Sequence, residues 1–236
     1  ASGFASIRCF NAAIQQTYQR PPRDLRKHTL MTTASPELPR ISLKLPFSPP
    51  YEWPTLIKFL AGRAMPGIEL VTSDAYQRTI AIEQSHGIIE VRPVPGKNYL
   101  MANIQFPQVA ALAQIVERLR HMFDLSADTT TIAMHLATDP DLAMRVEALP
   151  GLRVPGAWDS FELAVRAILG QQISVTAATT LASRLVAAYG EPLIAGEISW
   201  AAPELRFVFP CPERLIGADL TKLGITTARS HAITTL

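Results

Sequence analysis

The stretch GLRVPGAWDSFELAVRAILGQQISVTAATTLASRLVAAYG, residues 151–190, carries the clearest structural pattern of the chain. Apolar side chains recur in it at helical spacing over residues 159–169 and again over residues 174–189. The segment Gly170-Gln171-Gln172 separates the two periods, and glycine is common where a helix ends. The pattern predicts two helices joined by a short turn.

Helical spacing continues on both sides of this pair. The further predicted helices cover residues 129–137, 140–148, 211–217 and 226–236. After Asp124 the sequence shows helical patterns only, and the segment from Trp200 to Pro210 is predicted to be a loop. We therefore expect an all-α unit over residues 126–236.

The sequence between residues 41 and 125 has a different organisation. Alternating apolar residues predict strands over residues 41–47, 68–72, 77–83, 87–93 and 98–104, and helical spacing covers residues 54–63 and 107–123. Short turn-forming segments separate the later strands, which predicts an antiparallel meander covered by the second helix. The expected fold class is α+β, an antiparallel sheet domain with flanking helices, followed by the all-α unit.

The composition is that of a folded protein, because 48% of the 236 residues are hydrophobic and 18% are charged. No run of 18 apolar residues occurs in the sequence, so we expect no membrane span. Cys9 and Cys211 are too few for a disulfide framework or a cysteine-rich zinc site, and the histidines are scattered. We expect a cytoplasmic protein without a metal site.

Basic charge is concentrated at the start of the chain, where residues 1–50 carry seven Lys or Arg and two Asp or Glu. Helical spacing over residues 6–18 predicts a short amphipathic helix, which a basic segment follows. Residues 29–40 are rich in Thr, Ser and Pro and lack an apolar period, so they are predicted to be a linker. The basic charge is compatible with phosphate contacts and also with a solvated surface.

The segment GFASIRCFNAAIQQTYQRPPRDLRK, residues 3–27, resembles the C-terminal end of an AraC-type helix-turn-helix domain. The resemblance implies that residues 1–28 end such a domain, whose recognition helix enters the major groove of DNA. The residues in reach of base edges would be Ser6, Arg8 and Asn11. The residues that contact phosphates would be Arg23, Arg26 and Lys27. The alternative is an amphipathic surface helix with a basic tail.

Most of the remaining chain resembles DNA-3-methyladenine glycosylase II, the AlkA type of the helix-hairpin-helix glycosylase superfamily. The resemblance rests on PPYEWPTLIKFLAGRA at residues 49–64 and on residues 151–190, within which RAILGQQISV is the more specific motif. It implies a domain like a TATA-binding-protein repeat over residues 41–125 and an incomplete all-α glycosylase domain over residues 126–236. The strand and helix patterns predict the same order.

This resemblance also implies site residues. An enzyme that removes a base from duplex DNA must first extrude it, and a side chain then fills the gap in the stack. The matching position is Gln172, preceded by Gln171, and the alternative is a plain turn between helices. Phe59 occupies the position that stacks on an electron-poor alkylated purine, and the alternative is a core phenylalanine. Trp53, Trp158 and Phe161 are predicted to be core residues.

The catalytic carboxylate of the superfamily follows a Leu-Pro-Gly-Ile-Gly hairpin, which we expect beyond Leu236. The similar segment Ala148-Leu149-Pro150-Gly151-Leu152 lacks the second glycine and is predicted to be a turn. We therefore assign no catalytic residue, metal ligand or organic cofactor to this chain. Four arginines are candidates for phosphate contacts, with solvated surface as the alternative: Arg153, Arg166, Arg184 and Arg229.

The resemblance implies base excision of alkylated purines such as 3-methyladenine and 7-methylguanine from double-stranded DNA, by a monomer fused to an alkylation-response transcriptional regulator. Because the chain starts at Ala1 within one helical pattern and stops at Leu236 within another, we expect a fragment that is inactive alone. The alternative is a non-catalytic DNA-binding regulator in which the glycosylase-like part recognises damage. A structural fragment without activity is a third possibility.

Overall fold

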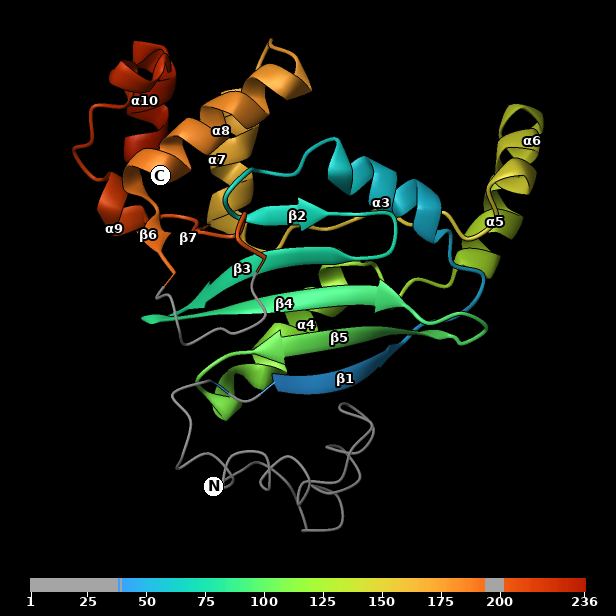
Figure 1. Cartoon of the computed structure of the whole chain (residues 1–236). Helices are drawn as coiled ribbons and strands as arrows, with labels where there is room; N and C mark the ends of the chain where they lie inside the picture. The colour runs from blue at the N-terminus through green and yellow to red at the C-terminus, as the bar shows by residue number, and fades with distance from the viewer. Residues whose placement is uncertain (1–37, 39, 194–201) are drawn as a thin grey trace, which may run out of the picture.

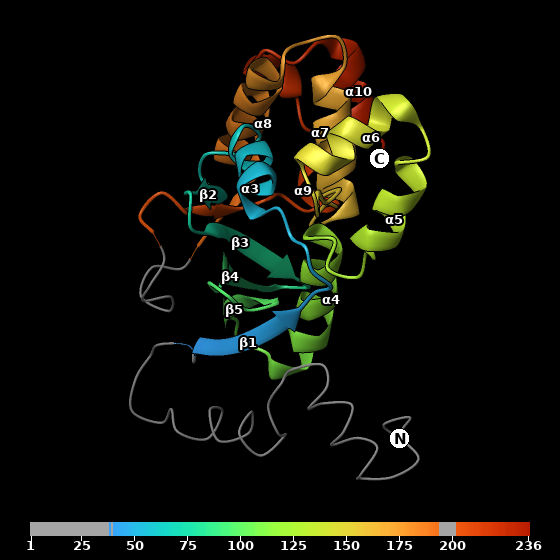
Figure 2. The ribbon, with the colours of Figure 1, turned by 90° about the vertical axis from the view of Figure 1, so that its right-hand side faces the viewer.

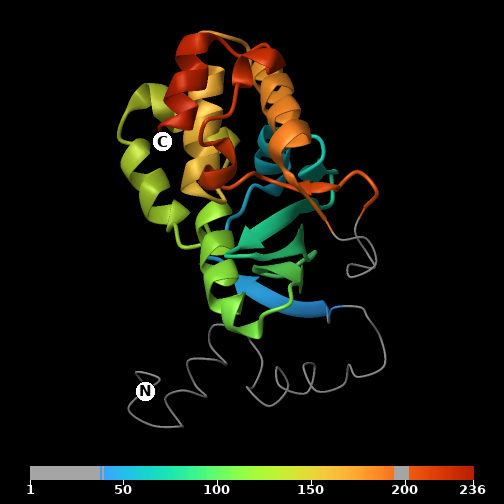
Figure 3. The same ribbon diagram turned by 90° about the vertical axis from the view of Figure 1, so that its left-hand side faces the viewer.

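The computed structural model describes residues 38, 40–193 and 202–236. A five-stranded antiparallel sheet forms one part, and a group of helices lies beyond one edge of it (Figure 1). Views from the two sides show helix α4 against one face of the sheet and helices α7, α8 and α10 at one end of the molecule (Figures 2 and 3).

The sheet contains β1 (Arg40–Pro46), β2 (Glu69–Val71), β3 (Tyr76–Ile82), β4 (Ser85–Pro93) and β5 (Tyr99–Gln105). The strand order is β1-β5-β4-β3-β2, so the last four strands form a meander and β1 pairs with β5 at the far edge. Every pairing is antiparallel, with Leu43 opposite Ala102 and Ile89 opposite Ile104. The predicted meander is confirmed.

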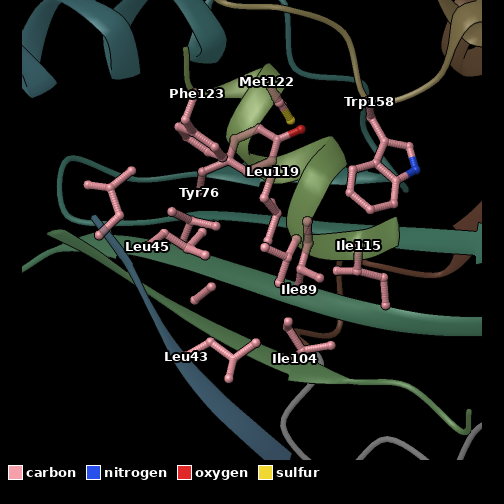
Figure 4. Close-up of a cluster of buried hydrophobic side chains, with 14 of the residues drawn as sticks. Leu43, Leu45, Tyr76, Ile89, Ile104, Ile115, Leu119, Met122, Phe123 and Trp158 are labelled. Atoms are coloured by element: carbon pink, nitrogen blue, oxygen red, sulfur yellow. The ribbon is translucent and has the colours of Figure 1, made fainter. Parts of the chain in front are cut away.

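One face of the sheet is covered by α4 (Leu112–Met122), which follows a single 3-10 turn at Val109–Ala111. Ile115 and Leu119 of this helix lie in one buried cluster with the apolar sheet residues Leu43 and Ile104 (Figure 4). Helix α3 (Trp53–Ala61) contributes its own apolar face to the same cluster. Alternation in the strands and a helical period in α4 therefore supply matching apolar surfaces.

The helical part contains α5 (Thr129–Leu136), α6 (Pro140–Ala148), α7 (Ser160–Gly170), α8 (Val175–Tyr189), α9 (Pro212–Leu215), a 3-10 turn at Leu220–Leu223 and α10 (Thr227–Thr234). Several helices start at the polar residue that the sequence offers as a cap. Asp128, Asp139, Asp159 and Ser174 each accept a hydrogen bond from a backbone N–H of the following turn. The predicted helices are confirmed to within about two residues at most ends.

The prediction that the chain is helical only after Asp124 is wrong. A two-stranded sheet pairs β6 (Glu191–Pro192) with β7 (Phe207–Val208), and β7 lies within the segment that was predicted to be a loop. Strands of two residues are too short to show alternation. The segment is held by tertiary contacts, since the N–H groups of Arg206 and Phe207 both donate to the carbonyl of Gly67.

A second buried cluster lies between α7, α8 and α10 and includes Val165, Leu185 and Ile233. Met65 and Ile68, from the connection between α3 and β2, belong to this second cluster and not to the first. The first cluster in turn includes Trp158, which precedes α7. Each part therefore contributes apolar side chains to the buried cluster of the other part.

Helices α5 and α6 contribute to neither of these two clusters, and they project from the rest of the molecule (Figure 1). Their apolar residues are largely exposed to solvent, and they include Ile132, Met134, Leu136, Leu142 and Met144. Across the described part of the chain, no helix combines the length and the apolar character that crossing a membrane requires.

Candidate nucleic-acid interface

The candidate interface is centred on the turn between α7 and α8, which contains the motif RAILGQQISV. Leu169 of α7 and Leu185 of α8 are fully buried in the second cluster, which holds the two helices together. The helix α8 is capped by Ser174, whose hydroxyl oxygen accepts a hydrogen bond from the N–H of Ala177 at 3.2 Å. Four residues thus reverse the chain between two packed helices.

Gln171 and Gln172 form the exposed part of this turn. Gln171 has φ −59° and ψ 125°, and Gln172 has φ 56°, which is the left-handed region. Residues other than glycine rarely adopt this conformation, and they cluster at functional sites when they do. The structure therefore places both predicted residues in an exposed turn with a constrained backbone.

Two arginines attach the hairpin to the end of the chain. The Nη2 of Arg229 in α10 donates to the carbonyl of Gln171. The Nη1 of Arg184 in α8 donates to the carbonyl of Leu223 at 3.2 Å. Both arginines are predicted either to contact phosphates or to lie on solvated surface. Arg184 is exposed, which agrees with the second alternative, and Arg229 is half-buried, while each also binds a backbone carbonyl of the protein.

A pocket of about 230 Å³ lies beside the turn, between α7, α8 and the C-terminal end of α3. Its lining is mostly apolar and includes Leu163, Ala167, Ile173, Val175 and Ala178. Arg63, Arg166 and Gly170 also line it, so the pocket reaches the start of the turn.

Phe59 lies on the solvent side of α3, with 42% of its surface exposed. The alternative prediction of a core phenylalanine is therefore wrong, because the apolar residues on the other side of α3 supply its buried face. The guanidinium carbon of Arg63 lies 3.7 Å from the centroid of the Phe59 ring. Because Arg63 also lines the pocket beside the turn, it connects Phe59 with the region of Gln171 and Gln172.

The aromatic residues that were predicted to be core residues are in the core or at its edge. Trp53 is 7% exposed and Trp158 is 5% exposed, and both belong to the first cluster. Phe161 is half-buried and packs against the second cluster.

A network of buried charges joins the sheet to α7. The Nη2 of Arg78 in β3 lies 2.6 Å from Oε2 of Glu162, and both side chains are almost completely buried. The Nη1 of Arg166 lies 3.2 Å from Glu69 and 3.3 Å from Glu162. The hydroxyl of Tyr76 donates to Glu69 at 2.5 Å. The guanidinium of Arg166, a candidate for phosphate contacts, therefore forms ion pairs with two carboxylates of the protein.

The same network sets the protonation of its members. Burial is the largest single effect and opposes the charge of Arg78, but the neighbouring groups, led by the carboxylate of Glu162, together more than offset it, so the pKa of Arg78 is raised above its usual value. Burial raises the pKa of Tyr76 well above its usual value, and the neighbouring Glu69 raises it further. Tyr76 therefore stays a neutral hydrogen-bond donor.

Arg166 also links the network to the candidate interface. Its Nη2 donates to the carbonyl of Arg63 at 2.6 Å, so the residue that stacks on Phe59 is tied to α7. The i,i+4 spacing of Glu162 and Arg166 was the only signal of this network in the sequence. The pairing with Glu69 bridges 97 positions and leaves no local pattern.

Arg153 is likewise a structural residue, and its side chain is buried. Its guanidinium donates to the carbonyls of Asp124 and Ala127, both at 2.8 Å, and to those of Ser48 and Pro50. Burial lowers the pKa of Arg153 below its usual value. Arg153 thus links the segment before α3 to the segment after α4. Because its side chain is buried, the prediction of a phosphate contact or a solvated side chain is wrong.

The residues assigned to the helix-turn-helix end lie outside the described residues, and they are Ser6, Arg8, Asn11, Arg23, Arg26 and Lys27. Within residues 38, 40–193 and 202–236, no three His, Cys, Asp or Glu side chains come together as a metal site. The segment Ala148–Leu152 starts at the last residue of α6 and continues as a turn, which is the conformation predicted for it.

The fold is that of a DNA glycosylase. The structure of the 3-methyladenine DNA-glycosylase from Archaeoglobus fulgidus matches with a TM-score of 0.67 over 82% of this chain and 65% of that chain, at 20% identity. A structure of MBOgg1 in complex with a low affinity DNA ligand matches with a TM-score of 0.54 over 83% of this chain and 60% of that chain, at 18% identity.

The chain belongs to the AlkA family, because the profile of the AlkA N-terminal domain matches residues 42–159, half of its length. The probable bifunctional transcriptional activator/DNA repair enzyme AlkA of Mycobacterium tuberculosis is 35% identical over 238 residues, or 100% of this chain and 47% of that protein. DNA-3-methyladenine glycosylase 2 of Escherichia coli is 33% identical over 192 residues, or 80% of this chain and 64% of that protein. The chain thus spans less than two thirds of either relative.

Proposed function

We propose that the protein removes alkylated purines, such as 3-methyladenine and 7-methylguanine, from double-stranded DNA by hydrolysis of the N-glycosidic bond. The observation that carries the proposal is the exposed turn of Gln171 and Gln172, with its left-handed backbone, on the α7–α8 hairpin of an AlkA-family fold. The name of the Escherichia coli relative, DNA-3-methyladenine glycosylase 2, supports the substrate class. The protein acts as a monomer in the cytoplasm.

In this proposal Gln172 enters the stack and fills the gap left by the extruded base. Its amide is flat and carries both a donor and an acceptor, so it can stack on the neighbouring bases and hydrogen-bond to the orphaned partner. Gln171 borders the minor groove beside it. Exposure of both side chains in the free protein supports this role, because no rearrangement is needed to present them.

Phe59 is proposed as the stacking surface for the extruded base. An alkylated purine is electron-poor and favours an aromatic face, by about 0.5–2 kcal/mol. One face of the ring is occupied by the guanidinium of Arg63, so the base would stack on the other face or displace Arg63. To displace Arg63, a base must interact with the ring more strongly than the guanidinium does, which a cationic alkylated purine can do better than a neutral purine.

No residue of the chain is assigned the catalytic step. Glu162 is buried and paired with Arg78, and Asp159 caps α7 while lying 3.4 Å from Arg118. Both carboxylates therefore have structural roles and receive no catalytic assignment. The proposed reaction uses water as the nucleophile and needs neither a metal nor an organic cofactor.

We also propose a domain organisation. Residues 1–28 end an AraC-type helix-turn-helix domain, residues 29–40 are a linker, residues 41–125 form the AlkA-type α+β domain, and residues 126–236 begin the glycosylase domain. The relative from Mycobacterium tuberculosis supports the first assignment, since its similarity extends over the whole chain and its name includes a transcriptional activator.

The proposal is tested by incubating the intact gene product with methylated duplex DNA and measuring the release of 3-methyladenine. We expect release by the wild-type protein and a loss of about tenfold or more in the single-turnover rate of Gln172→Ala, with an unchanged melting temperature. Damage-specific binding without release would favour the non-catalytic regulator. The chain of residues 1–236 alone is expected to release no base.

A further inference from the structure

The peptide bond between Gln171 and Gln172 has an orientation that the local sequence does not favour. The dihedral angles of Gln171, φ −59° and ψ 125°, are those of the first central residue of a type II turn. A type II turn requires a positive φ at the second central residue, where glycine or asparagine is preferred. This chain has Gln172 there, with φ 56°.

A type I turn would suit these residues better. It connects the same flanking residues and accepts most side chains at both central positions, with negative φ throughout. The two turns differ mainly in their central peptide, which is turned over so that its carbonyl points in the opposite direction. Some contact from outside the turn must therefore hold the type II form in place.

That contact is made by Arg229. Its Nη2 donates to the carbonyl of Gln171, which is the carbonyl of the central peptide. Turning the peptide over would break this bond. We infer that Arg229 is a positioning residue that holds the Gln171–Gln172 turn in the type II form and so sets the direction in which Gln172 leaves the backbone. This inference rests on the proposed role of Gln172.

The position of Arg229 suits this task. It lies on α10, where the neighbouring Ser230 and Ile233 are buried, so its backbone is anchored in the body of the protein. A cation close to the C-terminal end of α7 also interacts favourably with the helix dipole, and a hydrogen bond from a charged donor is stronger than a neutral one. The turn is thus held from an element that follows it by 58 positions.

The expected consequence is a defect in base extrusion with little change in DNA affinity. Without Arg229 the turn would exchange between its two forms, and only the type II form would present Gln172 correctly. The loss of one charge-assisted hydrogen bond predicts a decrease of about tenfold in the excision rate. The dissociation constant for undamaged duplex should change much less.

The test compares Arg229→Leu with Arg184→Leu in the intact protein. The control variant removes a similar bond, from Arg184 to the carbonyl of Leu223, which fastens the same two parts but does not involve the turn. The readouts are the single-turnover excision rate, the affinity for undamaged duplex, and the fluorescence of 2-aminopurine placed opposite the damaged base. Arg229→Lys, which keeps a charged donor, should restore part of the activity.

A separate readout does not depend on activity. In ¹⁵N NMR spectra of the chain, Arg229→Leu should shift or broaden the amide signals of Gln172 and Ile173, because exchange between the two turn forms is fast and averages their signals, and Arg184→Leu should change these signals much less. If the wild-type protein excises no base, the proposed function fails, and this NMR comparison still tests the turn. Equal effects of the two leucine variants, or unchanged amide signals of Gln172 and Ile173 in Arg229→Leu, would overturn the inference.

Discussion

The substitution Arg78→Met tests whether the buried charges between the sheet and α7 hold the two parts together. The side chain of Arg78 is 2% exposed, and its guanidinium lies 2.6 Å from Glu162, which is 5% exposed. Methionine has a similar length and no charge, so the substitution leaves the Glu162 carboxylate buried with Arg166 at 3.3 Å as its remaining partner.

The magnitude follows from this geometry. Removing one partner of a buried ion pair costs about 3–5 kcal/mol of unfolding free energy, because an uncompensated charge stays in the interior. Arg166 keeps part of the attraction, so we expect about 3 kcal/mol for Arg78→Met. For a chain of this length, that corresponds to a decrease of about 6–12 °C in melting temperature.

Urea unfolding followed by circular dichroism measures the effect, with Arg92→Met as the control. Arg92 also pairs with a carboxylate, that of Glu90, but it is 48% exposed, so its removal should cost less than about 1 kcal/mol. The double variant Arg78→Met/Glu162→Leu should recover most of the loss, since no unpaired charge remains. A cost below about 1 kcal/mol for Arg78→Met, or a double variant as unstable as the sum of the two single ones, would refute the reasoning.

Three further predictions concern stability. Arg153→Met should lower the unfolding free energy by about 3 kcal/mol, measured by urea unfolding, because it removes the four bonds to backbone carbonyls. Gly151→Ala should be destabilising, because φ is +81° and a Cβ atom would lie 2.4 Å from the backbone of Pro50. Gly217→Ala is its control, with φ +71° and no atom within 4 Å, so only the backbone cost of about 1–2 kcal/mol applies, and equal melting temperatures would contradict the packing argument. Burial raises the pKa of Glu90, but hydrogen bonds, led by that from Arg92, outweigh this effect and lower the pKa. The charged Glu90 therefore stabilises the fold near neutral pH, and this stabilisation is lost as the pH falls through the lowered pKa of the folded state. Glu90→Gln should therefore lose less stability than the wild-type protein between pH 7 and pH 3, and parallel pH profiles would count against this.

Most of the fold could be predicted from the sequence because its elements carry their own period. The alternation in β1 and the helical spacing in α4 and α8 each reflect one buried face, so the pattern is local and visible. The strands β6 and β7 could not be predicted, since each has two residues, they pair with each other, and β7 is held by hydrogen bonds to the carbonyl of Gly67.

The candidate site was predicted less evenly. The position of Gln171 and Gln172 in a turn followed from the break between two helical periods. The exposure of Phe59 did not follow, because helical spacing alone does not say which apolar residue lies at the edge of a buried face. The partners of Arg153 and Arg229 are backbone carbonyls distant in sequence, and a carbonyl leaves no residue type by which a sequence could reveal it.

During synthesis of the protein, Met65 and Ile68 are made long before the helices that cover them. Met65 and Ile68 are fully buried, but their partners extend to Ile233 near the end of the chain. At about 5–20 residues per second, roughly ten to thirty seconds separate the synthesis of Ile68 from that of Ile233. During this interval the nascent sheet carries two apolar side chains whose covering helices have not yet been made, and apolar surface that is exposed in this way favours aggregation during folding.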